Sequence, residues 1–124
     1  VLVVEDNEDL ATLYDSYCIG SPYELRHIKE GKKALERAKD LQPDLIVLDV
    51  MLPDVDGWDL LLNLHTDPKT RDIPVAVCSV ITDERLALDL GARIYLRKPV
   101  WREQLIGAFD AILRPAGASE QREP

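Results

Sequence analysis

The chain has 124 residues, 46% of them hydrophobic, which is enough for one compact domain but not for two domains with self-sufficient cores. Its formal net charge of -8 and its pI of about 4.7 exclude a broad basic face. Because nucleic acids and anionic lipids are bound through clustered Lys and Arg, we expect no direct nucleic acid binding by this domain.

The cysteines and the apolar runs indicate the compartment. Two cysteines, Cys18 and Cys78, are too few for a disulfide framework and are expected to be buried apolar residues. No apolar run reaches the roughly 18 residues of a membrane span. No signal peptide pattern precedes Val1, although a chain that starts in a strand without Met looks trimmed. We therefore expect a cytoplasmic protein with no membrane insertion.

Four apolar runs rich in β-branched residues, and a fifth segment in which apolar and polar residues alternate, predict strands. They cover residues 1–4, 23–28, 45–48, 75–78 and 94–96. Four of them are continuous apolar runs, which is typical of strands buried on both faces. The exception is 23–28, where apolar and polar residues alternate and favour a position at the edge of a sheet.

Amphipathic segments alternate with these runs and predict helices at residues 9–19, 32–41, 58–65, 83–90 and 102–113. Such alternation predicts a parallel sheet with right-handed crossovers and helices on both faces. We expect an α/β fold of the flavodoxin-like, doubly wound type, a three-layer sandwich around five parallel strands. The domain is expected to span residues 1–113, followed by a polar linker or tail, 114–124.

Polar residues closely follow four of the predicted strands. In chain order these are Glu5, Asp6, Asp49, Ser79 and Lys98. Ligands of doubly wound folds bind outside the carboxyl ends of the strands, so we expect these side chains at one edge of the sheet. Three converging carboxylates repel one another unless a cation is present. A site made of carboxylates without His or thiolate favours Mg²⁺, with Mn²⁺ as the second choice.

The lysine, the serine and one aspartate of this edge point to phosphoryl transfer. An ammonium and a hydroxyl group are suited to holding phosphoryl oxygens. A carboxylate can be the nucleophile of such a reaction and form an acyl phosphate. Asp49 is the natural candidate because it ends the most apolar run, whereas Glu5 and Asp6 form a pair suited to a metal. Each acid alone is more simply explained as a strand end or a helix cap, but the five residues together favour a reactive site.

Four motifs follow one another along nearly the whole chain: VLVVEDNED, DLIVLDVMLPDVDG, VAVCSV and GARIYLRKPV. They resemble the motif blocks of the response-regulator receiver family, also called the CheY-like family, of two-component signalling systems. The resemblance implies a domain that takes a phosphoryl group from a sensor histidine kinase, in trans or within a hybrid kinase, and signals to an output domain or effector protein. It implies no enzyme acting on other substrates, only Mg-dependent catalysis of the domain's own phosphorylation and dephosphorylation.

The resemblance also assigns roles to single residues. Asp49 becomes the phosphoacceptor, and the catalytic set is Asp49, Ser79 and Lys98. The metal site comprises Glu5, Asp6, Asp49 and Met51, of which Met51 contributes its main-chain carbonyl and Glu5 holds waters. The Lys98–Pro99 bond is expected to be cis. Ser79 and Tyr95 are expected to switch conformation on phosphorylation, although a simply packed Tyr95 is equally compatible with the sequence.

Two features depart from the family pattern. Between Ser79 and Lys98 the chain is short and leaves room for only about two turns of a fourth helix, in the region that usually forms the output face. The dimerisation or effector surface of the family therefore does not carry over, and a homodimer stays open. Val80 stands where the family tends to have a small residue, and we expect its side chain to crowd the phosphoryl group and slow dephosphorylation.

Other functions stay open at this point. The main alternative is a receiver-like interaction module that is never phosphorylated. Hydrolases of the haloacid-dehalogenase type also place a nucleophilic aspartate after an apolar strand, in the pattern Asp-x-Asp. Here residue 51 is Met, so the general acid of that pattern is missing. A nucleotide-binding flavodoxin-like module is disfavoured, because no Gly-rich or Ser/Thr-rich phosphate loop follows the first strand. The sequence does not identify the kinase, the signal or the output domain.

Overall fold

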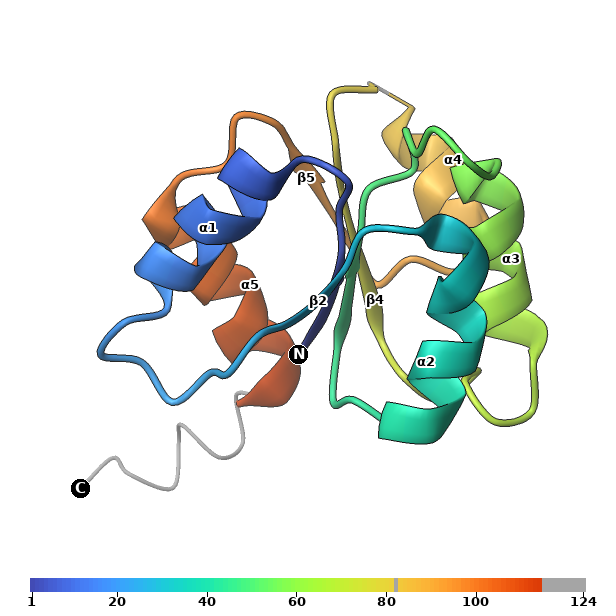
Figure 1. The fold of residues 1–124 in the computed structure, drawn as a ribbon, viewed down its shortest axis with the longest axis horizontal. Coiled ribbons are helices and arrows are strands. Elements are labelled where there is room, and N and C mark those ends of the chain that lie inside the picture. Colours follow the sequence, from blue (N-terminus) through green and yellow to red (C-terminus); the bar gives the residue numbers. More distant parts are fainter. Residues whose placement is uncertain (82, 115–124) are drawn as a thin grey trace.

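The computed structural model describes residues 1–81 and 83–114, which form a five-stranded parallel sheet between two layers of helices (Figure 1). The strands are β1 (Leu2–Val4), β2 (Arg26–Ile28), β3 (Ile46–Leu48), β4 (Val75–Ser79) and β5 (Ile94–Arg97). The helices are α1 (Glu8–Tyr17), α2 (Ala34–Leu41), α3 (Gly57–Thr66), α4 (Glu84–Asp89) and α5 (Arg102–Leu113), with a short 3₁₀ turn, η1 (Gly31–Lys33), before α2. The predicted doubly wound, flavodoxin-like fold is confirmed.

The strand order is β2-β1-β3-β4-β5, and every neighbouring pair is parallel. From β1 the chain moves to β2 on one side and then returns to β3 on the other. The order therefore reverses between β1 and β3, and in open α/β sheets ligands bind at such a switch point. The strand predicted to lie at an edge, β2, does lie at one.

Alternate residues of the central strands point into two separate cores. Val4, Leu48 and Val77 pack toward α2, α3 and α4, whereas Val47 and Cys78 pack toward α1 and α5. Figure 1 shows these two helical layers on opposite sides of the sheet. Because successive side chains of a strand point to opposite faces, continuous apolar runs are what a sheet covered on both faces requires. Both cysteines are buried, as predicted.

Local signals explain where the helices begin. Asn7 caps α1 by accepting a hydrogen bond from the backbone N–H of Leu10 at 3.1 Å. Asp56 caps α3, and Asp83 caps α4, each accepting through its side chain from a backbone N–H of the first turn. The helix α4 has six residues, so the short fourth helix predicted from the sequence is confirmed.

Some predicted boundaries were wrong by a few residues. The strand expected at 23–28 begins only at Arg26, which pairs with Leu2 of β1, and Tyr23 packs edge-on against Phe109 of α5 with ring centroids 5.2 Å apart. The helix expected at 9–19 ends at Tyr17, shortly before Gly20, whose φ of 82° is left-handed. The helix expected at 32–41 starts with the 3₁₀ turn η1.

The predicted linker, 114–124, falls outside the described residues except for Arg114. Among the described residues, no helix combines the length and the apolar character needed to cross a membrane.

Candidate functional site

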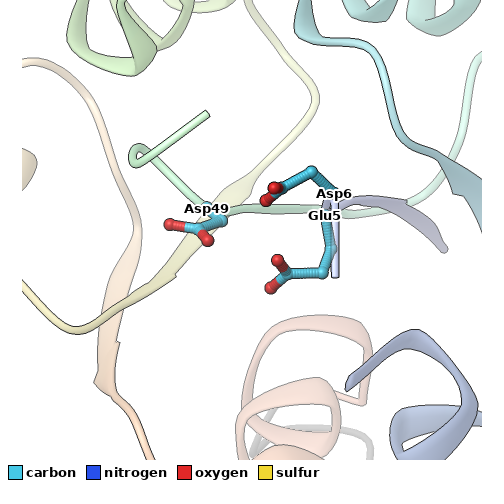
Figure 2. A group of neighbouring side chains, drawn as sticks. All are labelled: Glu5, Asp6 and Asp49. Atoms are coloured by element: carbon cyan, nitrogen blue, oxygen red, sulfur yellow. The ribbon is translucent and has the colours of Figure 1, made fainter. Parts of the chain in front are cut away.

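The candidate site lies at the carboxyl ends of β1 and β3, where the strand order reverses. The backbone N–H of Asp49 donates to the carbonyl of Val4 at 3.1 Å, and that of Glu5 donates to the carbonyl of Ile28 at 3.1 Å. The sheet ladder thus continues one residue beyond each strand and fixes the backbone of both acidic residues. Figure 2 shows the side chains of Glu5, Asp6 and Asp49 grouped at this edge.

The three carboxylates form a tight cluster. Each of Glu5, Asp6 and Asp49 offers an oxygen that lies within 4.8 Å of the oxygens offered by the other two. Glu5 is 4% and Asp49 5% exposed, whereas Asp6 is more open to solvent. Carboxylates are almost never buried without a partner, so this cluster requires positive charge.

Lys98 supplies part of that charge from the end of β5. Its Nζ lies 2.6 Å from Oε1 of Glu5 and 2.9 Å from Oδ2 of Asp49. All three side chains are largely buried, with 11% of the Lys98 side chain exposed. A single ammonium group neutralises only one of the three carboxylates, so the site keeps a net negative charge that favours a further cation.

The burial of this network changes the pKa values of its members. Burial raises the pKa of Glu5, although the hydrogen bond and the charge of Lys98 act in the opposite direction. Burial alone would lower the pKa of Lys98, but its hydrogen bonds to Glu5 and Asp49 outweigh this effect and raise it. The pair of carboxylates therefore favours the protonated form of the lysine.

The segment after β3, residues 50–56, lies close to Asp49. The backbone N–H of Met51 donates to Oδ1 of Asp49 at 2.9 Å. A Cβ atom on Gly57 would lie 2.1 Å from the carbonyl oxygen of Val50, so the first residue of α3 sits directly against the start of this segment. Glycine is thus required at position 57 by contact with the backbone.

Ser79 is the last residue of β4 and is fully buried. Its carbonyl accepts a hydrogen bond from the backbone N–H of Lys98 at 3.0 Å, so the two residues sit side by side at the sheet edge. Its hydroxyl accepts from the backbone N–H of Ile81 at 3.4 Å. The next residue, Val80, is 55% exposed.

Tyr95 on β5 is half-buried and packs against the core that faces α4. Its hydroxyl is buried and makes no hydrogen bond among the described residues. A buried hydroxyl without a partner is energetically costly.

Two contacts that sequence reasoning missed hold the segment after β5. The hydroxyl of Tyr17 donates to the carbonyl of Val100 at 3.0 Å, and Nε of Arg102 donates to the carbonyl of Tyr17 at 3.0 Å. They join the end of α1 to the chain that follows the cis Lys98–Pro99 bond, which was predicted. Each contact joins residues more than 80 positions apart, so no local sequence pattern predicts it.

The donor set of the acidic cluster fits a hard divalent cation. Glu5, Asp6 and Asp49 offer only oxygen atoms, and among the described residues no His or Cys belongs to the cluster. Carboxylate oxygens suit Mg²⁺ or Mn²⁺ better than softer metals. The structure brings these three residues, Ser79 and Lys98 together at one edge, as predicted.

Comparison with known proteins agrees with this architecture. Residues 1–110 match the family described as "Response regulator receiver domain". The chain is 35% identical over 117 residues to the DNA-binding dual master transcriptional regulator RpaA of Synechocystis sp., covering 92% of this chain and 48% of RpaA. It is 34% identical over 119 residues to the polar-differentiation response regulator DivK of Brucella anthropi, covering 94% of this chain and 97% of DivK.

A solved structure supports the same relationship. The crystal structure of a putative response regulator from Chloroflexus aurantiacus superposes with a TM-score of 0.84 at 28% identity, covering 91% of this chain and 95% of that one. The chain spans about half the length of the first curated relatives, between 48% and 52%.

Proposed function

The chain belongs to the response-regulator receiver family, and on this premise we propose that Asp49 is the residue that receives the phosphoryl group. Receiver domains act as phosphoacceptors in two-component signalling. The observation that carries the assignment is the position of Asp49: it follows the central strand β3, lies in the acidic cluster and contacts Lys98 at 2.9 Å.

The phosphoryl donor is a phosphorylated histidine of a sensor kinase. An oxygen of the Asp49 carboxylate attacks phosphorus, the new O–P bond gives an acyl phosphate, and the electron pair of the broken P–N bond stays with the imidazole, which takes up a proton. Hydrolysis of the O–P bond by water restores the carboxylate and releases phosphate. The domain catalyses only these two steps on itself.

Lys98 and Ser79 hold the phosphoryl group after transfer. The ammonium group of Lys98 already contacts Asp49 and needs only a small movement to reach a phosphoryl oxygen, where its charge stabilises the product. The buried hydroxyl of Ser79 makes one long contact, 3.4 Å to the N–H of Ile81, and is therefore available to donate to a second phosphoryl oxygen.

Receiver domains bind Mg²⁺ at an acidic site, and we assign Asp6, Asp49 and the carbonyl of Met51 as the protein ligands here, with Glu5 holding waters. When bound, the cation neutralises the charge that gathers on the phosphoryl oxygens. Glu5 and Asp49 are both largely buried, so their carboxylates would face a bound cation rather than solvent. Mn²⁺ has the same ligand preference.

A phosphoryl group adds about two negative charges and three strong acceptor oxygens to the site. These attract Ser79 and Lys98 and favour one of two conformations of the domain. The buried hydroxyl of Tyr95 has no hydrogen-bond partner among the described residues, and this unsatisfied position supports a role as a switch. The changed conformation then signals to an output domain or an effector, and a cytoplasmic location suits such a partner.

Intact mass spectrometry tests this proposal. The wild type and Asp49→Asn are incubated with a small phosphodonor, with and without Mg²⁺. We expect a gain of one phosphoryl group that needs both Mg²⁺ and Asp49. If the wild type gains none with any divalent ion, the domain is an interaction module that is not phosphorylated.

A further inference from the structure

Asp54 joins the segment after β3 to a distant part of the chain. Its Oδ1 accepts a hydrogen bond from the backbone N–H of Gly31 at 3.1 Å, and its Oδ2 accepts one from the N–H of Lys32 at 3.1 Å. Both donors belong to η1, the turn that leads into α2. A single carboxylate thus connects two loops that lie 22 and 23 residues apart in sequence.

The two N–H groups need such a partner. The first N–H groups of a helical segment have no acceptor within the segment. Glu30, the residue at the cap position of η1, makes no capping hydrogen bond with its side chain. Asp54 therefore supplies the cap from another element, and the N–H groups of Lys32 and Gly31 lower the pKa of its carboxyl group.

Apolar contacts press the same segment onto η1. A Cβ atom on Gly31 would lie 2.5 Å from Cγ2 of Val55 and 2.7 Å from Cδ1 of Leu52. Only a glycine allows this approach. The hydrogen bonds of Asp54 and the apolar contacts of Leu52 and Val55 all reach Gly31 or Lys32. Polar and apolar interactions therefore both hold the segment on η1.

Met51 lies between two fixed points of the segment. One is the contact of Asp54 with η1. The other is at the start of the segment, where Gly57 rests against the backbone of Val50 and the N–H of Met51 donates to Asp49. We propose that Asp54 is a positioning residue: by fixing the segment on η1, it holds the carbonyl of Met51 in place for the divalent cation. This inference rests on the proposed function, which assigns that carbonyl as a metal ligand.

Titration calorimetry with Mg²⁺ alone measures the effect. Residues that orient metal ligands typically change metal affinity by about 10- to 100-fold when removed, so we expect Asp54→Ala to weaken Mg²⁺ binding about tenfold. Asp54→Asn keeps one acceptor oxygen and should lose less. At saturating Mg²⁺ the maximal rate of phosphorylation should return close to the wild-type rate, because Asp54 touches neither the phosphoryl group nor Asp49.

A second variant separates positioning from simple capping of α2. Glu30 has the extended backbone of an N-cap residue, so Glu30→Ser can provide a local cap. The double variant Asp54→Ala/Glu30→Ser should regain thermal stability but still bind Mg²⁺ about tenfold more weakly than the wild type. If Asp54→Ala binds Mg²⁺ as the wild type does, or if the double variant regains wild-type affinity, the inference is overturned while the proposed function stands. A wild type that binds no Mg²⁺ would instead contradict the proposed metal site itself.

Discussion

The Nζ of Lys98 lies 2.9 Å from Oδ2 of Asp49, although the two residues are 49 positions apart and follow different strands, the edge strand β5 and the central strand β3. The contact is largely buried, with 11% and 7% of the side chains exposed. A buried carboxylate and a buried ammonium stabilise the fold only while both are present, since either one alone is an uncompensated charge. The same pair therefore contributes to stability and to the proposed chemistry.

Removal of this lysine should destabilise the fold. In Lys98→Met, Glu5 and Asp49 lose their shared partner, and we expect the free energy of unfolding in urea, at neutral pH without divalent ions, to fall by about 3 kcal/mol. Lys29→Met is the matched control, because Lys29 pairs with Glu8 at 2.9 Å but both side chains are mostly exposed. The control should change little. Equal losses of unfolding free energy in the two variants would show that burial does not increase the contribution of the Lys98 network to stability.

Gly57 and Gly107 should respond oppositely to the same substitution. Gly57→Ala places a methyl group 2.1 Å from the carbonyl oxygen of Val50, so we expect a loss of about 3 kcal/mol in unfolding free energy and weaker Mg²⁺ binding. Gly107 lies within α5, and in the described part of the chain no atom approaches its Cβ position within 4 Å. Gly107→Ala should therefore gain about 0.5–1 kcal/mol. A tolerated Gly57→Ala would contradict the close approach at the start of the segment.

The pair of Tyr23 and Asp110 should make stability depend on alkaline pH. Burial and the hydrogen bond that Tyr23 donates to Asp110 raise the pKa of the phenol to about 12 from its usual value of 10.0. Since the folded pKa is raised, the contribution is fully present below pH 10 and is lost as the pH rises through 12. At pH 8, Tyr23→Phe should be about 1 kcal/mol less stable in urea unfolding than the wild type.

That difference should shrink as the pH rises above 10. Asp110→Asn keeps an acceptor and serves as the control for the loss of the carboxylate charge. A gap between the wild type and Tyr23→Phe that stays constant from pH 8 to beyond pH 10 would rule out the assigned shift.

Val80 should influence the lifetime of the acyl phosphate. Its side chain follows Ser79 directly and is 55% exposed, so it stands at the surface beside the reactive edge rather than within the core. We expect Val80→Ala to admit water more easily and to shorten the lifetime a few-fold, measured as release of phosphate. Val80→Thr keeps the branched shape and should behave as the wild type. An unchanged lifetime in Val80→Ala would reject the role of this residue as a shield.

The sequence predicted the fold, and the meeting of the candidate residues at one edge of the sheet, for identifiable reasons. Continuous apolar runs identified the strands, and the rule that parallel strands carry their ligands at the carboxyl ends placed Glu5, Asp49 and Lys98 at one edge. The helix α5 was predicted at its observed bounds, 102–113, because a proline follows closely and its amphipathic pattern is unbroken.

The contacts that hold the site were not predictable. The bond from Tyr17 to Val100 and the bonds from Gly31 and Lys32 to Asp54 join loops that are remote in sequence. No period or motif encodes such contacts, because they depend on how the loops fold over the sheet edge. The same holds for the packing of Tyr23 on Phe109 of α5.

The central claim, that the phosphoryl group is carried by Asp49, can be tested at the level of the residue. Borohydride reduces an acyl phosphate to an alcohol, so treatment of the phosphorylated domain converts the modified aspartate to homoserine, which peptide mass spectrometry locates. We expect homoserine at position 49 and an intact Ser79. Homoserine at Asp6, or a phosphate that resists borohydride and maps to Ser79, would contradict the assignment.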